Sequence, residues 1–590
     1  MTATVKTFDL DATLPDLPVP RLEDTLARYL ESVRPLVDDA TFADVEAAAG
    51  ELLEPGSVGR LLQQALEVRA ALRDNWLSGW WEDVAYLSYP ESLVINSSIG
   101  ISTDARYAPG DQAMRAAQLT GGALDFYKAI VDQTLPPEVQ RDGSGFDMSL
   151  LQRFYATTRY PGTDKDRIAT FGGGQSRHIV VVRTHRFYAV EVIDESGNRL
   201  PDGDLMVQFR RIIAKADAAP PAPAVGVLTA ARRPDWAAAR DRLAASHRNR
   251  RTLDRIDRAL FLVCLDDVLS PTFEDLARAG LYGQKGNRWH DKSFHLVIDP
   301  QGRFTLHGEH SPVDAGAWVP LIEAIGGPAE PLPEQAETSE PAPRELTWDL
   351  APETEADIAD AGVLFDNLTR DLDLRIENFT GFGKDLIKTF RTGPDPLLQM
   401  SFMLAYYRLY GRLPKTYEAA STRMFKGGRT ETIRTASNEA LAFVKAMEGS
   451  DYSASQKVEL LQAAFAEHAK RGKEASAAQA CDRHLLGLRL IAREAGLSEL
   501  PGFFSQEIFT RGWELSTAQL PMQVGFVNHF GAVCPEGYGI GYIIKPDHIN
   551  INVTSFHSHP NTDSSRFLGE ITRALHDMRA VLELVLRQAA

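Results

Sequence analysis

The spacing of apolar residues predicts helices at the start of the chain. Large apolar side chains recur every three or four residues between 22 and 36 and again between 61 and 72, the period of an amphipathic helix. Further along, β-branched and aromatic runs predict two hairpins, each closed by a short polar turn. The paired runs are His178–Val182 with Phe187–Ile193, and Phe294–Ile298 with Phe304–His307.

The second half of the chain combines long helical patterns with a group of strands near its end. Helices are predicted at Leu397–Tyr410, Ile433–Met447, Lys457–Lys470, Ala475–Ala495 and from Ser565 onward; strands are predicted at Val524–Phe530, Tyr538–Ile544 and Ile549–Val553. Because both halves mix helices with strands, the predicted fold class is α/β.

A chain of 590 residues is too long for one hydrophobic core, so two domains are expected. The segment 327–345 is rich in Pro, Glu and Ala and nearly lacks large apolar residues, as exposed linkers do. We therefore predict domains at 1–350 and 351–590, and residues 68–89 could pack with the second. The low-complexity segment 214–224 is predicted to be a surface loop.

Composition narrows the choice of partners. The formal net charge of -17 opposes binding to a phosphate backbone, so nucleic acid is not expected as a partner. Cys264, Cys481 and Cys534 are far apart, which suggests neither a disulfide framework nor a cysteine zinc site. The chain shows no signal peptide and no apolar run long enough to cross a bilayer, so a soluble cytoplasmic protein is expected.

His310 is a candidate for proton transfer. It lies in LHGEHSPVDAG directly after a predicted strand, and a histidine can accept and return a proton near neutral pH. Taken alone, any of the 14 histidines is more often a hydrogen-bonded structural residue. His307 with His310 and His557 with His559 have spacings that metal ligands use, but no carboxylate or cysteine set completes either pair, so no metal is expected. The chain also lacks a GxSxG elbow and a P-loop.

Several segments resemble, in the same order, the motifs of the choline/carnitine acyltransferase family. They include NWLSGWWEDVAYL at 75–87, GNRWHDKSFHLVI at 286–298, EHSPVDAG at 309–316, LAYYRLYGRLPKTYEAASTRMFKGGRTETIRTAS at 404–437, DRHLLGL at 482–488 and PEGYGIGY at 535–542. The resemblance implies two similar domains, each like chloramphenicol acetyltransferase, with the reaction centre in a tunnel at their interface. It also implies that His310 is the general base of a direct transfer, with both substrates bound together and no acyl-enzyme.

The same resemblance implies a binding site for coenzyme A or acyl-coenzyme A, used as a co-substrate without any permanent cofactor. Lys384 and Lys388 in GFGKDLIK, with Asp395, would hold the phosphorylated adenosine end, and Gln519 would contact the same molecule. Without the motif, two lysines four residues apart are more often a solvated surface.

The acceptor side of the resemblance points to a carboxylated hydroxy compound. Tyr417, Thr430 and Arg483 match the family's carboxylate clamp, and choline-acetylating members lack this arginine and threonine. Trp81 and Tyr86 match aromatic residues that line the tunnel, although such side chains are commonly just core. Asp314 falls where the family commonly has glutamate, four residues after His310, and the resemblance implies an acidic role for it beside the clamp arginine.

Two positions depart from the pattern of carnitine enzymes. The family typically reads Ser-Thr-Ser-Gln where this chain has Ser516, Thr517, Ala518 and then glutamine, so the serine that donates to the developing oxyanion is missing. Asn528 stands where a residue limits the acyl pocket, and a buried amide favours a short or polar acyl group over a bare long alkyl chain.

The leading hypothesis is reversible transfer of a short or functionalised acyl group between coenzyme A and carnitine or a carnitine-like acceptor. Two alternatives stay open: a biosynthetic acyltransferase that uses another acceptor or a carrier-bound donor, and an acyl-coenzyme A-binding protein with little turnover. Only small-molecule partners are expected, and nothing in the sequence requires more than a monomer.

Overall fold

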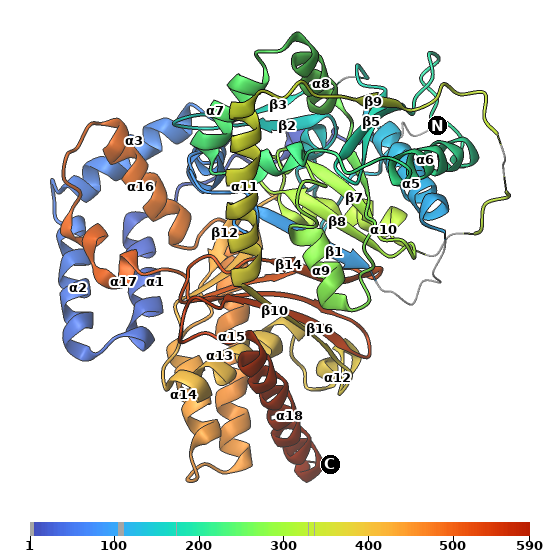
Figure 1. The fold of residues 1–590 in the computed structure, drawn as a ribbon. Coiled ribbons are helices and arrows are strands. Elements are labelled where there is room, and N and C mark those ends of the chain that lie inside the picture. The colour runs from blue at the N-terminus through green and yellow to red at the C-terminus, as the bar shows by residue number, and fades with distance from the viewer. Residues whose placement is uncertain (1–4, 104–110, 173, 328–329, 335–336, 590) are drawn as a thin grey trace.

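The N-terminal helices pack against a helix that is more than 400 residues away in the chain. The computed structural model describes residues 5–103, 111–172, 174–327, 330–334 and 337–589 (Figure 1). Leu26, Leu66 and Trp76 share an apolar cluster with Leu485 and Leu488. The helices are α1 (Leu22–Val33), α2 (Asp39–Leu53), α3 (Val58–Ala71) and the short α4 (Ser78–Glu82), facing α16 (Asp482–Glu494) with α17 (Glu507–Thr510) nearby.

The larger of the two main sheets has eight strands in the order β14-β1-β8-β7-β6-β4-β5-β9. Their bounds are β1 (Ser98–Thr103), β4 (His178–Arg183), β5 (Arg186–Glu191), β6 (Leu262–Leu265), β7 (Phe294–Ile298), β8 (Phe304–Glu309), β9 (Arg344–Leu346) and β14 (Gly525–Phe530). Both predicted hairpins are confirmed, because β4 pairs antiparallel with β5 and β7 pairs antiparallel with β8. A separate two-stranded ribbon joins β2 (Thr157–Tyr160) and β3 (Arg167–Thr170).

Helices cover both faces of this sheet, which is why β4 and β6 to β8 are buried along their whole length. One face packs against α5 (Gln112–Val131), α6 (Asp202–Asp217) and α10 (Val319–Ile325). The other packs against α7 (Arg233–Leu243), α8 (His247–Arg258), α9 (Phe273–Leu281) and α11 (Pro352–Asp371).

The surface loop predicted at 214–224 is wrong for its first residues, since α6 continues to Asp217 and buries Ala216 in the core.

The second sheet has six strands in the order β10-β16-β15-β13-β11-β12. These are β10 (Leu372–Phe379), β11 (Thr416–Ser421), β12 (Thr430–Ile433), β13 (Leu515–Gln519), β15 (Tyr538–Ile544) and β16 (Ile549–Phe556). Its apolar core contains side chains of α12 (Lys384–Thr389), α13 (Pro394–Tyr410), α14 (Asn438–Glu448), α15 (Ala454–Ser476) and α18 (Ser564–Ala589). In Figure 1 this layer lies below the larger sheet. The α/β class predicted from the sequence is confirmed.

Strand β14 joins the two sheets. It follows β13 of the six-stranded sheet in sequence but pairs antiparallel with β1 of the eight-stranded sheet. Its other edge receives side-chain hydrogen bonds from β16: Asn550 Nδ2 donates to the Phe526 carbonyl at 2.8 Å, and Thr554 Oγ1 donates to the Phe530 carbonyl at 2.8 Å. These bonds satisfy backbone groups at a sheet edge and hold β14 between the sheets.

Some predicted boundaries need correction. Ile433 ends strand β12 rather than starting a helix, and the pattern predicted at 475–495 is divided between α15 and α16. In the described part of the segment 327–345, the last residues contribute to β9, which pairs with β5; residues 328–329 and 335–336 lie outside the described residues. Among the helices that the structure describes, none combines the length and apolarity that crossing a bilayer requires.

Candidate active site

A cavity of about 740 Å³ lies between the two sheets. Strands β1 and β14 line it on one side, and β11 and β13 line it on the other. Most of its wall is apolar, but a small group of polar side chains converges on it, which is typical of a site for a small molecule. His310 is one of these polar residues.

His310 follows the last residue of β8, so a strand fixes its backbone while its side chain stays 23% exposed at the cavity wall. The Tyr86 hydroxyl lies 3.1 Å from Nδ1, and the two rings stack with centroids 5.1 Å apart. Within the described residues Nε2 has no hydrogen-bond partner. If Nδ1 carries the proton and donates it to the Tyr86 oxygen, Nε2 has a free lone pair and can accept a proton from a bound substrate.

Asp314 lies beside His310, with Oδ1 at 3.9 Å from Nδ1. The family resemblance implies an acidic group beside Arg483, but the ion-pair partner of Asp314 is Arg429, at 2.7 Å and 3.1 Å. Burial alone would raise the pKa of Asp314, but the Arg429 guanidinium more than offsets this and the pKa lies below its ordinary value. Sequence reasoning missed Arg429, although it directly precedes Thr430 in the GGRTETIR segment.

The three predicted clamp residues lie together. Arg483 Nη2 is 3.3 Å from the Tyr417 hydroxyl and 3.2 Å from the Thr430 hydroxyl, and Nε donates to the Thr430 carbonyl at 2.9 Å. The indole of Trp81 covers the guanidinium, whose carbon is 3.7 Å from the ring centroid. Tyr417, Thr430 and Trp81 line the cavity, so Arg483 acts on it from behind two hydroxyls.

Comparison with known proteins gives this arrangement its context. The sequence profile described as "Choline/Carnitine o-acyltransferase" matches residues 17–573. The chain belongs to the choline/carnitine O-acyltransferase family. It is 35% identical to carnitine O-acetyltransferase of Homo sapiens over 97% of this chain and 94% of that protein, and 34% identical to that of Columba livia over 97% and 93%. Choline O-acetyltransferase of Homo sapiens is 35% identical over 97% of this chain and 80% of that protein.

The protein is therefore a coenzyme A-dependent O-acyltransferase, as the resemblance in its motifs implies. Similarity to carnitine and to choline enzymes is nearly equal, so overall identity does not select the acceptor. That choice depends on individual side chains around the cavity.

Strand β13 brings most of the predicted acyl-side residues to the cavity. Ser516, Thr517, Ala518 and the glutamine that follows line it, and Asn528 on β14 faces them. Asn528 is 4% exposed, and its Nδ2 donates to the Ala518 carbonyl at 3.0 Å. Because this bond fixes the orientation of the amide, Oδ1 is the atom left over, and it has no partner in the described part of the chain. The position of the missing serine is occupied only by the Ala518 methyl group.

The residues predicted for the adenosine end lie outside this cavity. Lys384 begins α12 and Lys388 lies one turn later, so both project from the same short helix, the first half-buried and the second exposed. Neither forms an ion pair with any residue that the structure describes, which leaves both ammonium groups available to an anion.

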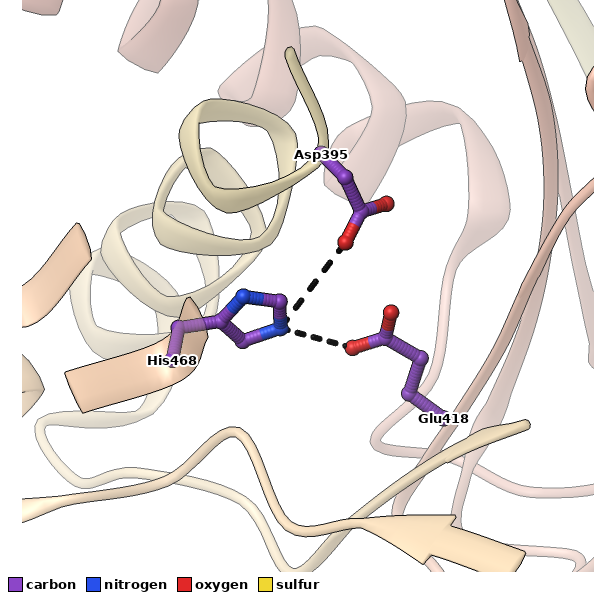
Figure 2. Close-up of side chains that lie close together, drawn as sticks. All are labelled: Asp395, Glu418 and His468. Carbon is purple, nitrogen blue, oxygen red and sulfur yellow. Dashed lines mark hydrogen bonds and ion pairs between the residues drawn. The ribbon is translucent and has the colours of Figure 1, made fainter. Parts of the chain in front are cut away.

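Asp395 belongs to a cluster with Glu418 and His468, three side chains that point toward one another (Figure 2). Nε2 of His468 is 2.8 Å from a Glu418 oxygen and 3.9 Å from an Asp395 oxygen. Tyr542 donates to the other Asp395 oxygen at 2.5 Å. Three potential metal ligands meet here, but a hydrogen-bonded histidinium between two carboxylates also accounts for the geometry.

Burial and the charge of Glu418 raise the pKa of Asp395 to about 7. Burial would lower the pKa of His468, but Glu418 outweighs it and the net shift is upward. The cluster underlies the floor of the cavity, because Glu418 lies on β11 between two residues that line it, Tyr417 and Ala419. Asp395 is 34% exposed and forms the open end of the cluster.

Proposed function

We propose that this chain transfers a short or functionalised acyl group reversibly between coenzyme A and the hydroxyl of carnitine or a carnitine-like carboxylated acceptor. In this proposal both substrates occupy the cavity together. Lys384 and Lys388 bind the phosphorylated end of coenzyme A, and the cavity between the sheets holds the acceptor and the acyl group.

His310 acts as the general base. Nε2 takes the proton from the acceptor hydroxyl as its oxygen attacks the acyl carbonyl, and the resulting imidazolium returns that proton to the sulfur of coenzyme A as the carbon–sulfur bond breaks. Tyr86 keeps the proton of neutral His310 on Nδ1, and the Asp314 carboxylate favours the imidazolium electrostatically. The reverse reaction starts with the thiol in place of the hydroxyl.

One observation supports a carboxylated acceptor above all: Arg483 is a buried cation without a carboxylate partner. The side chain is 6% exposed, and no ion pair to it occurs among the described residues. The nearby Glu431 is a weak counter-ion near neutral pH, because burial raises its pKa to about 7. Burial would lower the pKa of Arg483, but Tyr417, Glu431 and Asp482 more than offset it, and the pKa lies above its ordinary value. Among the described residues no carboxylate contacts the guanidinium directly, so a carboxylated ligand in the cavity would add the anion that the clamp lacks.

The hydroxyls of Tyr417 and Thr430 connect Arg483 to the cavity. Each accepts a hydrogen bond from Arg483 Nη2, so each can donate its own hydrogen to a carboxylate in the cavity. Choline has no carboxylate and would leave these two donors without an anion.

Ala518 favours a second candidate, an acyltransferase with a different hydroxylated acceptor. Removing one oxyanion donor costs about 10²- to 10³-fold in rate. An acceptor that supplies its own hydrogen-bond donor at this place would replace the missing serine, whereas the quaternary ammonium of carnitine has no N–H and offers only its charge.

Asn528 bears on the acyl group. Its unpaired Oδ1 accepts a hydrogen bond, so an acyl chain with a hydroxyl or amide N–H satisfies an atom that a bare alkyl chain would leave unpaired. This favours short or functionalised acyl groups.

The test is release of free thiol from acetyl-coenzyme A by the purified protein with L-carnitine, with choline and with no acceptor. We expect release that depends on carnitine and is abolished in His310→Ala, which should still bind coenzyme A. Equal rates with choline would contradict the assignment of Arg483, and full activity of His310→Ala would contradict the assignment of the base. No release with either acceptor, but retained coenzyme A binding, would favour the second candidate.

A further inference from the structure

A buried arginine binds both the residue that precedes His310 and the tyrosine that stacks on it, without lining the cavity. Arg159, at the third position of β2, is 1% exposed and does not line the cavity. Its Nη1 donates to a Glu309 oxygen at 3.0 Å, its Nη2 donates to the Tyr86 carbonyl at 2.7 Å, and its Nε donates to Asp166 at 2.7 Å. One rigid, planar group therefore holds three separate segments of the chain.

The contact with Glu309 fixes the backbone on either side of the histidine. Glu309 directly precedes His310, and its carboxylate also accepts from the backbone N–H and the hydroxyl of Ser311, the residue that follows it. Ser97, just before β1, donates to the same carboxylate at 3.2 Å. The orientation of His310 is thus set by a buried carboxylate whose charge Arg159 balances.

The contact with Tyr86 fixes the other partner of the histidine. Tyr86 lies in a single π-helical turn, Asp83–Leu87, that has no strand to support it. Arg159 holds this turn through its bond to the Tyr86 carbonyl. Asp166, which is bound to Arg159, holds it at a second point, because its backbone N–H donates to the Leu87 carbonyl at 2.9 Å. The distance between the Tyr86 hydroxyl and His310 Nδ1 therefore depends on Arg159.

We propose that Arg159 is a positioning residue for the acyl transfer. By joining the end of β8 to the Tyr86 turn, it keeps the Tyr86 oxygen against Nδ1 of His310, so that Nδ1 holds its proton and Nε2 faces the substrates as the base. Arg159 touches no substrate and acts only through Glu309 and Tyr86. This inference rests on the proposed role of His310 as the base.

The chain offers a matched control for a purely structural role. Arg233, at the start of α7, is also 1% exposed and also binds Asp166, at 2.6 Å, but its other partner is Asp291, at 2.7 Å. It contacts neither Glu309 nor Tyr86. Substitutions of Arg159 and Arg233 disturb the same buried charge cluster, including Asp166, but only the first removes direct bonds to Glu309 and to the Tyr86 carbonyl.

The experiment compares Arg159→Lys with Arg233→Lys. For each variant the Tm, the kcat and the KM for acetyl-coenzyme A are measured below the unfolding range. A lysine ammonium keeps the charge but cannot hold three acceptors in one plane, so Arg159→Lys should lower kcat by about 10- to 100-fold, the cost of a small misplacement of a reacting group. The KM for acetyl-coenzyme A should stay within about threefold, and Arg233→Lys should keep kcat within the same range at a similar loss of Tm.

A double-mutant cycle with Tyr86→Phe provides a second test, measured at a temperature where both single variants and the double variant are folded. If Arg159 acts through the Tyr86 hydroxyl, the double variant should have nearly the kcat of Tyr86→Phe alone. Fully additive losses, an unchanged kcat in Arg159→Lys, or an equal loss of kcat in Arg233→Lys would each overturn the inference.

His310→Ala is assayed beside these variants. If it retains full activity, the proposed base is wrong and the role of Arg159 falls with it. If it is inactive while Arg159→Lys has normal kcat, only the positioning role is wrong.

Discussion

Replacing Arg483 by methionine separates ligand binding from stability more sharply than any other change at this site. The substitution removes a guanidinium that donates to the Tyr417 and Thr430 hydroxyls and keeps an unbranched side chain against Trp81. In the free enzyme it also removes the bonds to the Thr430 carbonyl and the Thr432 hydroxyl, and relief of desolvation offsets part of this loss because no carboxylate contacts the guanidinium. We expect the loss of free energy of unfolding to stay below the ~3–5 kcal/mol that breaking a buried ion pair costs.

With the acceptor bound, the expected effect is large. Truncating one partner of a buried, hydrogen-bonded charge pair costs about 2–5 kcal/mol. At about 1.4 kcal/mol for each factor of ten, a cost near the middle of this range corresponds to a rise of roughly 100- to 1,000-fold in the KM for carnitine. The KM for acetyl-coenzyme A should change little, and the preference for carnitine over choline should collapse.

The assay is thiol release at varied carnitine, choline and acetyl-coenzyme A, together with urea denaturation. Arg434→Met is the control, because Arg434 is buried nearby but pairs with Asp482 at 2.8 Å and 2.9 Å. Removing it should cost about 3–5 kcal/mol of stability by leaving that carboxylate unpaired, with little effect on the KM for carnitine. The reasoning is refuted if Arg483→Met loses as much stability as Arg434→Met, or if it raises both KM values equally.

Three further changes test the acyl side and the core. Ala518→Ser should raise kcat with carnitine by up to about 10²-fold if a missing oxyanion donor limits the rate, and a decrease in kcat would mean that Ala518 makes room for the true acceptor. Asn528→Leu should raise kcat/KM for butyryl-coenzyme A by on the order of tenfold and lower it for 3-hydroxybutyryl-coenzyme A, and parallel changes for the two donors would contradict the role of Oδ1. Burial lowers the pKa of His307 and of His529 to about 3, so the unfolded chain binds more protons below pH 6.5 and stability should fall as pH drops, by about 2 kcal/mol per histidine at pH 5. Urea denaturation at pH 7 and pH 5 measures this loss; His529→Phe should reduce it, and an unchanged pH dependence in that variant would exclude His529 as a source.

Local structure could be predicted from the sequence wherever a single short residue pattern determines it. The turn Asp299-Pro300-Gln301-Gly302 specifies the β7–β8 hairpin, and Gly302 adopts the positive φ that this turn requires. Strand β14 was predicted as a strand, but its transfer to the other sheet was not, because its apolar pattern is the same whichever sheet it joins. The division of the pattern at 475–495 into two helices likewise follows from packing: Ala478, with a positive φ, turns the chain so that α16 can reach the N-terminal helices.

At the site, the family motifs drew attention to residues that the fold brings to or beside one cavity, the proposed clamp and His310, whereas the charges that hold them were not evident from sequence. Nothing in the residues next to Arg429 and Arg159 indicates an ion pair. Only the fold brings Arg429 to Asp314 and Arg159 to Glu309. Such pairs join residues that are more than 100 positions apart, and neither spacing nor propensity encodes that distance.

The buried arginines around the cavity differ in whether a carboxylate contacts them. This difference distinguishes arginines that hold the fold together from one that is available to a ligand. Arg159 and Arg429 each face carboxylates of the same chain, so their charge is compensated before any substrate arrives. Arg483 contacts hydroxyls and the Thr430 carbonyl, and the carboxylates of Glu431 and Asp482 act on it only from a distance. A protein that buried this cation only for stability would be expected to pair it, as it pairs the other two. The proposal of a carboxylated acceptor rests on this missing direct contact, and the stability of Arg483→Met, measured without substrate, tests whether the guanidinium serves the fold or the ligand.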